Sequence, residues 1–309
     1  MIDDHASKFY GLPVVEFEPQ LGIENPRNQV YRLAYNGDDK FQDMLDRFFN
    51  TPNVIEIQAL IIGDWSSDDY YTSDTNPDFL LLQLIEQRNK LPNLKALFIG
   101  DITSEECEIS WILQTDYAPL LQAFPQLEQL RVCGSNGLGF SQLEHNNLKT
   151  LIIESGGLPE TVIQSIIDAK LPALEHLELW LGEKEYGFDG DIETIKPLLE
   201  TGRFPKLRYL GLRDSEIVDE IAIEIATAPI LNQLDVLDLS LGILTDKGAQ
   251  ALLNSERIKS LKKLDLHHHY MSTSMMEKLK RLDIEVDVSE QEEDEYDDGE
   301  IYRYVAVSE

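Results

Sequence analysis

Carboxylate and imidazole side chains recur in this sequence inside short phrases where polar residues alternate with leucine. His176 and Glu178 share one phrase, Asp238 opens a second, and Asp265 and His267 lie in a third. These groups can transfer protons, coordinate a metal ion or bind a partner, provided that the fold brings the phrases together. The candidate metal ligands are His176, Asp265, His267 and His269.

The leucines of these phrases predict how the polar residues are positioned. Leu237 and Leu239 alternate as a short strand with inward-facing side chains. Leu234 and Leu244 fill the bends on either side, and residues 245–253 have the apolar spacing of a helix. This strand–helix unit is one turn of a leucine-rich repeat, which buries its apolar face only against neighbouring repeats.

The same pattern recurs along most of the chain. The central leucine of each unit recurs at steps of 21 to 37 residues, at Leu60, Leu97, Leu130, Leu151, Leu177, Leu210, Leu237 and Leu264. Steps of this length favour repeats that contain a helix. The pattern therefore predicts an α/β leucine-rich-repeat solenoid, a right-handed horseshoe of about eight repeats with a cap at each end.

The chain divides into three predicted regions. Residues 1–50 read as an N-terminal capping unit with a strand at 29–35 and a helix at 39–49. Residues 51–288 form the solenoid and end in an alternating strand. Residues 289–309 form an acidic C-terminal tail. We expect 289–300 to be disordered or loosely held, whereas the apolar residues 301–307 are expected to pair with the last strand, to fold back over the core or to be disordered.

Irregular steps between repeats locate unusual connections. The step from Leu130 to Leu151 leaves too little chain for a helix. Longer segments at 66–77, 103–115 and 183–191 are insertions that either help to bind a partner or vary neutrally in length.

Composition limits the classes of partner. The formal net charge is −31, from 26 Lys plus Arg against 57 Asp plus Glu. This field repels phosphate backbones and anionic membranes, so we expect no nucleic-acid or membrane partner. A protein or peptide of basic or neutral charge is the expected partner, while the oligomeric state is not predicted.

Cysteine content and the N-terminal residues favour the cytoplasm. The chain has two cysteines, too few for a disulfide scaffold, and its acidic start lacks an apolar signal region. Cys107 follows two glutamates, which should raise the pKa of its thiol.

The outward-facing strand positions define a predicted partner-binding patch on the concave face. Its acidic, aromatic and histidine side chains suit binding, the alternative being a solvated strand surface with no partner. Among the tryptophans, we expect Trp111 to be buried and Trp180 to be the surface anchor. The predicted binding residues are Glu154, His176, Glu178, Trp180, Tyr209, Arg213, Asp238, Ser240, Asp265 and His267.

Catalysis is not expected, and no cofactor is indicated. Glu178, Asp238 and Asp265 are paired carboxylates, but a concave face open to water should do little to shift their pKa values. The sequence has no phosphate-binding glycine loop, nucleophile elbow or paired Cys and His. The alternative function is a metal site at the C-terminal end of the face, although the histidine spacing matches no established metal motif.

Several phrases resemble a family of bacterial cytoplasmic leucine-rich-repeat proteins. These are GDITSEECEISWI at 100–112, ESGGLP at 154–159, LEHLELWLG at 174–182, LDLSLG at 237–242, LDLHHHYM at 264–271 and YVAVSE at 304–309. The resemblance covers nearly the whole chain and implies the fold but no activity. Members tend to be encoded near radical-SAM and ATP-grasp-like enzymes and WGR-domain proteins. The turns lack an asparagine ladder, which favours ribonuclease-inhibitor-like repeats.

Overall fold

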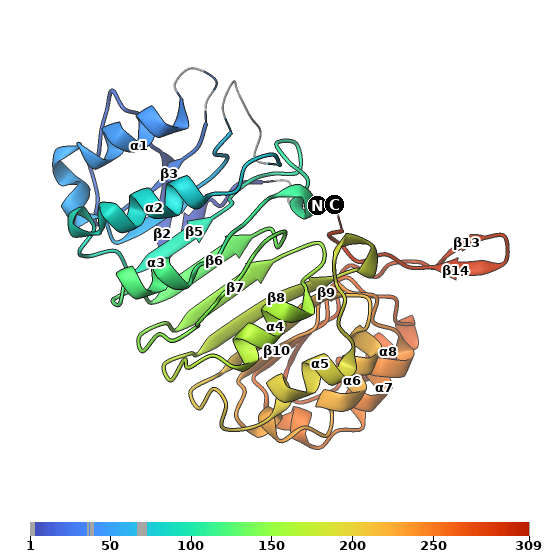
Figure 1. Ribbon diagram of the computed structural model, residues 1–309. Helices are drawn as coiled ribbons and strands as arrows, with labels where there is room; N and C mark the ends of the chain where they lie inside the picture. The colour runs from blue at the N-terminus through green and yellow to red at the C-terminus, as the bar shows by residue number, and fades with distance from the viewer. Residues whose placement is uncertain (1–3, 36, 38–39, 67–72, 309) are drawn as a thin grey trace. The chain divides into compact units, whose positions relative to one another are not determined.

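The computed structural model describes residues 4–35, 37, 40–66 and 73–308. The fold is α/β, with strands of a parallel sheet alternating along the chain with helices (Figure 1). It separates into two compact units. The first comprises Met1–Ile153 and Asp168–Pro172, and the second Glu154–Ile167 and Ala173–Ser308.

The first unit begins with a hairpin and continues as parallel strands. Its strands are β1 (Lys8–Phe9), β2 (Leu12–Glu16), β3 (Val30–Leu33), β4 (Ala59–Ile62), β5 (Ala96–Ile99), β6 (Gln129–Cys133) and β7 (Thr150–Glu154), whose last residue belongs to the second unit. Strands β1 and β2 pair antiparallel, whereas β2 to β6 pair in parallel order.

Helices of the first unit lie along its strands (Figure 1). They are α1 (Phe41–Phe49), α2 (Asp78–Glu86) and α3 (Ala118–Ala123), with 3-10 turns η1 (Pro52–Glu56), η2 (Arg88–Lys90) and η3 (Ile109–Trp111). The predicted strand at 29–35 and helix at 39–49 are confirmed as β3 and α1, whereas β1 and β2 were not predicted.

The leucine spacing correctly predicts the register of the first unit. Leu60 pairs with Leu97, which pairs with Leu130, and all three are completely buried. Each fully buried leucine contributes on the order of 1.5–3 kcal/mol through the hydrophobic effect. The short connection between β6 and β7 contains no helix, as its length predicts.

The second unit repeats a strand followed by a helix. Its elements are α4 (Glu160–Ile167), β8 (His176–Gly182), η4 (Lys184–Tyr186), α5 (Ile192–Ile195), η5 (Lys196–Leu199), β9 (Tyr209–Ser215), α6 (Val218–Ile225), η6 (Pro229–Asn232), β10 (Val236–Asp238), α7 (Asp246–Leu253), η7 (Arg257–Ser260), β11 (Lys263–Asp265), α8 (Thr273–Leu279), β12 (Glu285–Asp287), β13 (Glu295–Asp297) and β14 (Glu300–Tyr302). Strands β8 to β12 are parallel neighbours.

The core of the second unit lies between its sheet and its helices. Leu177, Leu210, Leu237 and Leu264 occupy one row across β8 to β11 and are completely buried. Helices α7 and α8 start where short polar side chains accept backbone N–H groups. Thr245 caps α7 through the N–H of Lys247, and Ser272 caps α8 through the N–H of Met275. These observations are consistent with a leucine-rich-repeat-like solenoid.

Part of the acidic C-terminal segment forms regular secondary structure that the sequence analysis did not predict. Strands β13 and β14 form an antiparallel hairpin that projects from the second unit (Figure 1). The chain after the hairpin folds back, one of the arrangements predicted for 301–307, and buries Val305 and Val307. The backbone N–H of Ala306 donates to the carbonyl of Leu241 at 2.8 Å.

Two further features are the predicted insertion at 66–77 and the length of the helices. Of the predicted insertion at 66–77, residues 67–72 lie outside the described residues. Among the residues that the structure describes, no helix is long and apolar enough to cross a membrane.

Candidate functional site

Four carboxylates occupy one row on the face of the second unit's sheet opposite the buried leucines. Glu178 on β8 is level with Gly211 on β9, which pairs with Asp238 on β10. Asp238 pairs with Asp265 on β11, and Asp265 pairs with Asp287 on β12. Neighbouring strands lie about 4.8 Å apart, so Asp238, Asp265 and Asp287 are direct neighbours, whereas the strand that carries Gly211 separates Glu178 from Asp238. We call Glu178, Asp238, Asp265 and Asp287 the carboxylate row.

Glu178 is the most heavily bonded member of the row. Its Oε1 accepts hydrogen bonds from Trp180 Nε1 at 2.9 Å and from Arg213 Nη1 at 2.8 Å. Its Oε2 lies 3.2 Å from the Tyr209 hydroxyl oxygen and 3.2 Å from His176 Nε2. The carboxylate is buried, with 6% of its surface exposed, so these bonds replace its hydration.

Arg213 and Tyr209 connect Glu178 to Asp238. Arg213 Nε donates to Ser240 Oγ at 2.9 Å and lies 3.4 Å from Asp238 Oδ2. The Tyr209 hydroxyl donates to the same Asp238 oxygen at 2.6 Å. Because the guanidinium is shared between two carboxylates, the row is a hydrogen-bonded network rather than a set of separate charges.

A glycine makes room for this network. At Gly211, an added Cβ would lie 3.1 Å from Glu178 Cγ and 3.1 Å from Tyr209 Cε1. Any larger residue would therefore push against the two side chains that bind Asp238 and Arg213. Gly211 therefore leaves the space that the side chains of Glu178 and Tyr209 occupy.

The environment shifts the acidity of the network strongly. Burial opposes ionisation of Glu178, but the bonds from His176, Arg213 and Trp180 outweigh it and lower the pKa of Glu178 to about 2. Burial, followed by the charges of Glu178 and Asp238, raises the pKa of Tyr209 far above its usual value. The expectation that this face does little to shift carboxylate pKa values is wrong for Glu178.

Aromatic rings pack onto the network. The rings of His176 and Tyr209 stack with centroids 3.7 Å apart and planes 6° from parallel. The Arg213 guanidinium carbon lies 5.1 Å from the centroid of the Trp180 ring. Trp180 is only 8% exposed whereas Trp111 is 59% exposed, so the predicted burial of Trp111 and the predicted exposure of Trp180 are both wrong. Trp180 is covered because Arg213 from the next strand lies over it.

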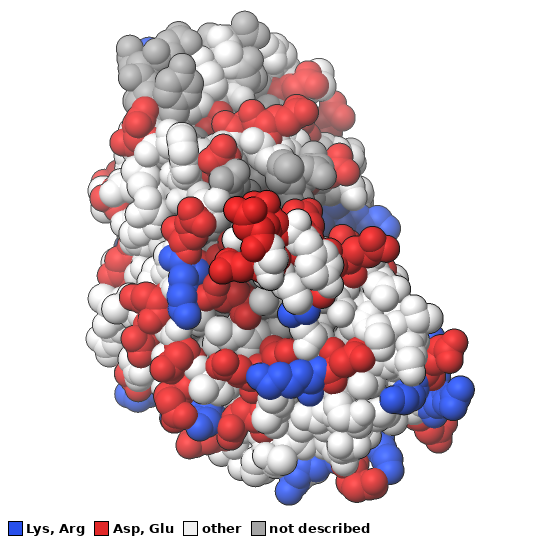
Figure 2. Space-filling model, turned by 90° about the vertical axis from the view of Figure 1, so that its right-hand side faces the viewer, with Lys and Arg blue, Asp and Glu red and all other residues white. Residues whose placement is uncertain are grey.

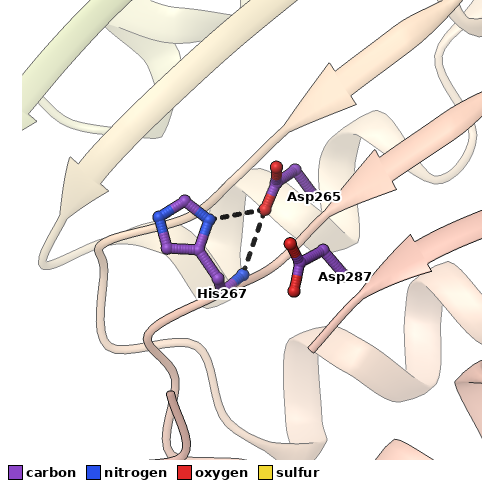
Figure 3. A group of neighbouring side chains, drawn as sticks. All are labelled: Asp265, His267 and Asp287. Carbon is purple, nitrogen blue, oxygen red and sulfur yellow. Dashed lines mark hydrogen bonds and ion pairs between the residues drawn. The ribbon is translucent and has the colours of Figure 1, made fainter. Parts of the chain in front are cut away.

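At the C-terminal end of the row, Asp265 and Asp287 lie close to His267 (Figure 3). His267, just after β11, places its Nδ1 2.6 Å from Asp265 Oδ1, and its backbone N–H donates to the same oxygen at 3.3 Å. Lys263 Nζ lies 2.8 Å from Asp265 Oδ2. Asp287 Oδ1 accepts from the N–H and hydroxyl of Ser289 at 3.0 and 2.7 Å.

These contacts account for the acidities at this end. Burial would raise the pKa of Asp265, but hydrogen bonds from His267 and Lys263 lower it well below its usual range. The bonds from Ser289 lower the pKa of Asp287. The bond to Asp265 raises the pKa of His267.

The structure does not group all the candidate metal ligands. His269 is completely buried, with Nε2 3.3 Å from the carbonyl of Val288 and Nδ1 accepting the N–H of Met271 at 3.1 Å. Both ring nitrogens are thus engaged by backbone. His176 stacks on Tyr209. Asp265 and His267 do lie together, and the neighbour that the sequence analysis missed is Asp287.

Glu154, the remaining predicted binding residue, ends β7 and is 3% exposed. This exposure is close to the 4% of Asp238 and the 6% of Glu178, so all three carboxylates offer a partner little surface of their own.

The first unit carries a buried ion pair that the sequence analysis missed. Arg32 Nε donates to Asp101 Oδ2 at 2.8 Å and Arg32 Nη2 donates to the carbonyl of Asp101 at 2.7 Å. Glu16 and Arg32 pair at 3.2 Å. An added Cβ at Gly63 would lie 2.4 Å from Arg32 Nη2, so this glycine provides the space for the guanidinium.

A cavity of about 460 Å³ lies in the first unit. Its lining includes Asp64, Glu106, Cys107 and the exposed ring of Trp111. Burial, then the charges of Asp64 and Glu108, raise the pKa of the Cys107 thiol to about 11. The prediction of a raised thiol pKa is confirmed, and Cys107 is therefore protonated and weakly nucleophilic at neutral pH.

The fold and the carboxylate row define an α/β protein consistent with the leucine-rich-repeat class. Its structure is similar to the crystal structure of a Bacteroides fragilis protein determined as a structural genomics target. The two share 34% sequence identity and a TM-score of 0.80, over 90% of this chain and 76% of that one. The chain belongs to the same protein family as this Bacteroides fragilis protein.

Other comparisons add little. An internalin from Listeria monocytogenes matches with a TM-score of 0.38 and 14% identity, over 85% of this chain and 74% of that one, which is too weak a likeness to support any inference. No family model and no curated protein matches the sequence.

Proposed function

We propose that the protein is a non-catalytic protein- or peptide-binding module that binds its partner along the carboxylate row. The observation that carries this proposal is the hydrogen-bonded network of Glu178, Tyr209, Arg213 and Asp238, which lies on the sheet face opposite the helices. We place this function in the cytoplasm.

The network supports binding because its side chains are held in fixed conformations before a partner arrives. Arg213 is fixed by Glu178 and Ser240, and Tyr209 by Asp238 and the stacked ring of His176. A surface that is already ordered loses little conformational entropy on binding. His176, Tyr209 and Arg213 are only partly buried, so they retain surface for contact.

Charge favours a basic or neutral partner. The chain has a formal net charge of −31, and Figure 2 shows acidic side chains spread over the displayed face with fewer basic ones among them. In the second unit, the exposed Glu285 on β12 adds a further carboxylate two residues from Asp287, the last member of the row. This potential should speed the association of cationic segments and slow it as salt rises.

The test begins with peptides selected on the immobilised full chain from a displayed random library. The affinity of a selected peptide is then measured by calorimetry for the wild type and for Glu178→Gln/Asp238→Asn, which removes two charges while preserving shape. We expect an affinity loss of at least tenfold in this variant and weaker binding at high salt.

The control places the same chemical change on the helical side. Glu193→Gln/Glu224→Gln alters two side chains that are 71% and 41% exposed. It should bind within twofold of the wild type. Because the row variant could lose stability, its thermal unfolding is measured first, and His176→Asn provides a milder change on the same surface. Equal binding by the wild type, Glu178→Gln/Asp238→Asn and His176→Asn would show that the partner does not bind this surface.

A further inference from the structure

Asp265, His267 and Asp287 form a compact group of unlike donors at the end of the carboxylate row. One ligand atom from each, two carboxylate oxygens and one imidazole nitrogen, lies within 4.8 Å of the others. Asp265 ends β11, Asp287 ends the adjacent strand β12, and His267 lies two residues after β11. Figure 3 shows the two carboxylates next to each other beside the imidazole ring.

We propose that Asp265, His267 and Asp287 bind a divalent first-row transition-metal ion such as Zn²⁺. One imidazole with two carboxylates is a mixed nitrogen and oxygen set, which suits these ions. Mg²⁺ and Ca²⁺ prefer oxygen ligands alone and should bind weakly. Water molecules would complete the coordination, because three side chains fill only part of it.

The geometry needs only small side-chain movements to close around an ion. Ligand atoms about 2.0–2.2 Å from a tetrahedral ion are separated by roughly 3.4 Å. The Asp265 and His267 atoms are already 2.6 Å apart, and the third atom lies within 4.8 Å. An ion would therefore require the Asp265 and His267 groups to move slightly apart and the Asp287 carboxylate to rotate toward them, with the backbone register unchanged.

Neighbouring groups hold the two carboxylates in place, and each carboxylate keeps one oxygen that these groups do not bind. Lys263 binds Asp265 Oδ2, and Ser289 binds Asp287 Oδ1 through two donors. Such outer contacts orient the ligands of metal sites. Asp265 Oδ1 and His267 Nδ1 face each other, so an ion would replace the proton between them. That proton moves to Nε2 of a neutral ring, or is released to solvent from a charged one.

The electrostatics of the row also favour a cation at this end. Asp238 shares Arg213 with Glu178, and Asp265 has Lys263 as its ion-pair partner. Asp287 stands beside Asp265 in the register and is stabilised by the neutral Ser289. Adjacent carboxylates repel, and a divalent cation between them removes that repulsion.

The test is titration of the chelator-treated, tag-free full chain with Zn²⁺ alone by calorimetry. We expect one equivalent to bind, with an affinity at least tenfold weaker in Asp287→Asn and in His267→Gln. Co²⁺ should give an absorption spectrum that changes in His267→Gln, because its nitrogen ligand is lost. Excess Mg²⁺ should not displace either ion.

Matched controls separate this site from general attraction to an acidic surface. His268→Asn changes the adjacent histidine, whose positive φ of 56° asparagine tolerates. Asp283→Asn changes an exposed carboxylate that precedes β12. Both should keep Zn²⁺ affinity within twofold. Absence of stoichiometric binding to the wild type, equal losses in the control variants, or undiminished binding in the His267→Gln/Asp287→Asn double variant would overturn the proposal. Thermal unfolding of each variant verifies that the fold persists.

Discussion

The buried carboxyl group of Asp214 accepts a 2.9 Å hydrogen bond from the backbone N–H of Val307, so the end of β9 holds the C-terminal segment. Asp214 is completely buried and adopts a left-handed backbone conformation with φ of 53°. Burial raises the pKa of this carboxyl group well above its ordinary value, although the bond from Val307 opposes the shift.

The first prediction concerns the pH dependence caused by Asp214. Between the unfolded pKa near 3.8 and the raised folded pKa, the folded protein keeps a proton that the unfolded chain has lost. Its contribution to stability therefore falls as pH rises through this window. Asp214→Asn can accept the same bond and tolerates positive φ, but it does not titrate. We expect the stability of the variant relative to the wild type to increase with pH, as measured by urea unfolding from pH 4 to 8. A pH-independent difference would contradict this.

The second prediction concerns Glu178, whose folded pKa of about 2 lies below its ordinary 4.5. The stabilisation is fully present above the unfolded pKa and is lost as pH falls toward 2. A shift of this size corresponds to about 3 kcal/mol. Glu178→Gln should be less stable than the wild type at pH 7 but should approach it below pH 3. The measurement is urea unfolding at pH 2–7, with Glu193→Gln as the exposed control. A constant gap over this range would show that the carboxylate does not titrate as described.

The leucine pattern predicted the register because side chains alternate strictly along a strand. Once Leu177, Leu210, Leu237 and Leu264 are assigned to one buried row, Glu178, Asp238 and Asp265 must form the neighbouring row on the other face. The same alternation in 283–288 could have added Asp287, which the sequence analysis left out.

Burial of the row could not be read from the sequence. It depends on Arg213 reaching two carboxylates from β9 and on Gly211 leaving space for Glu178 and Tyr209. The burial of Trp180 was not predicted for the same reason, since the side chain that lies over its ring is Arg213 on the neighbouring strand. The order of the C-terminal residues depends on Asp214, which is 93 positions from its partner in the chain.

The third prediction uses a pair of glycines with positive φ. Gly182 ends β8 with φ of 68°, and an added Cβ would overlap the backbone of Gly156 and Gly157. Gly202 has φ of 92° and open space around its Cβ position. Alanine at either site costs about 1–2 kcal/mol from its backbone conformation. Gly182→Ala should lose at least about 1–3 kcal/mol more, because the backbone itself must shift. Urea unfolding compares the two, and similar losses would show that the strand end accommodates a side chain.

The fourth prediction concerns the anchoring of the C-terminal segment by Tyr270. The Tyr270 hydroxyl donates to the carbonyl of Tyr304 at 3.1 Å and accepts its N–H at 3.0 Å. Tyr270→Phe removes both bonds, each of which contributes about 0.5–1.5 kcal/mol. The segment should then open more often, so amide hydrogen exchange at Tyr304 and Ala306 should accelerate while exchange in β8 stays unchanged. Tyr302→Phe is the control, because that hydroxyl donates only to Glu300 on the same hairpin strand. Equal exchange rates in Tyr270→Phe and the wild type would show that Asp214 and the buried valines hold the segment without this tyrosine.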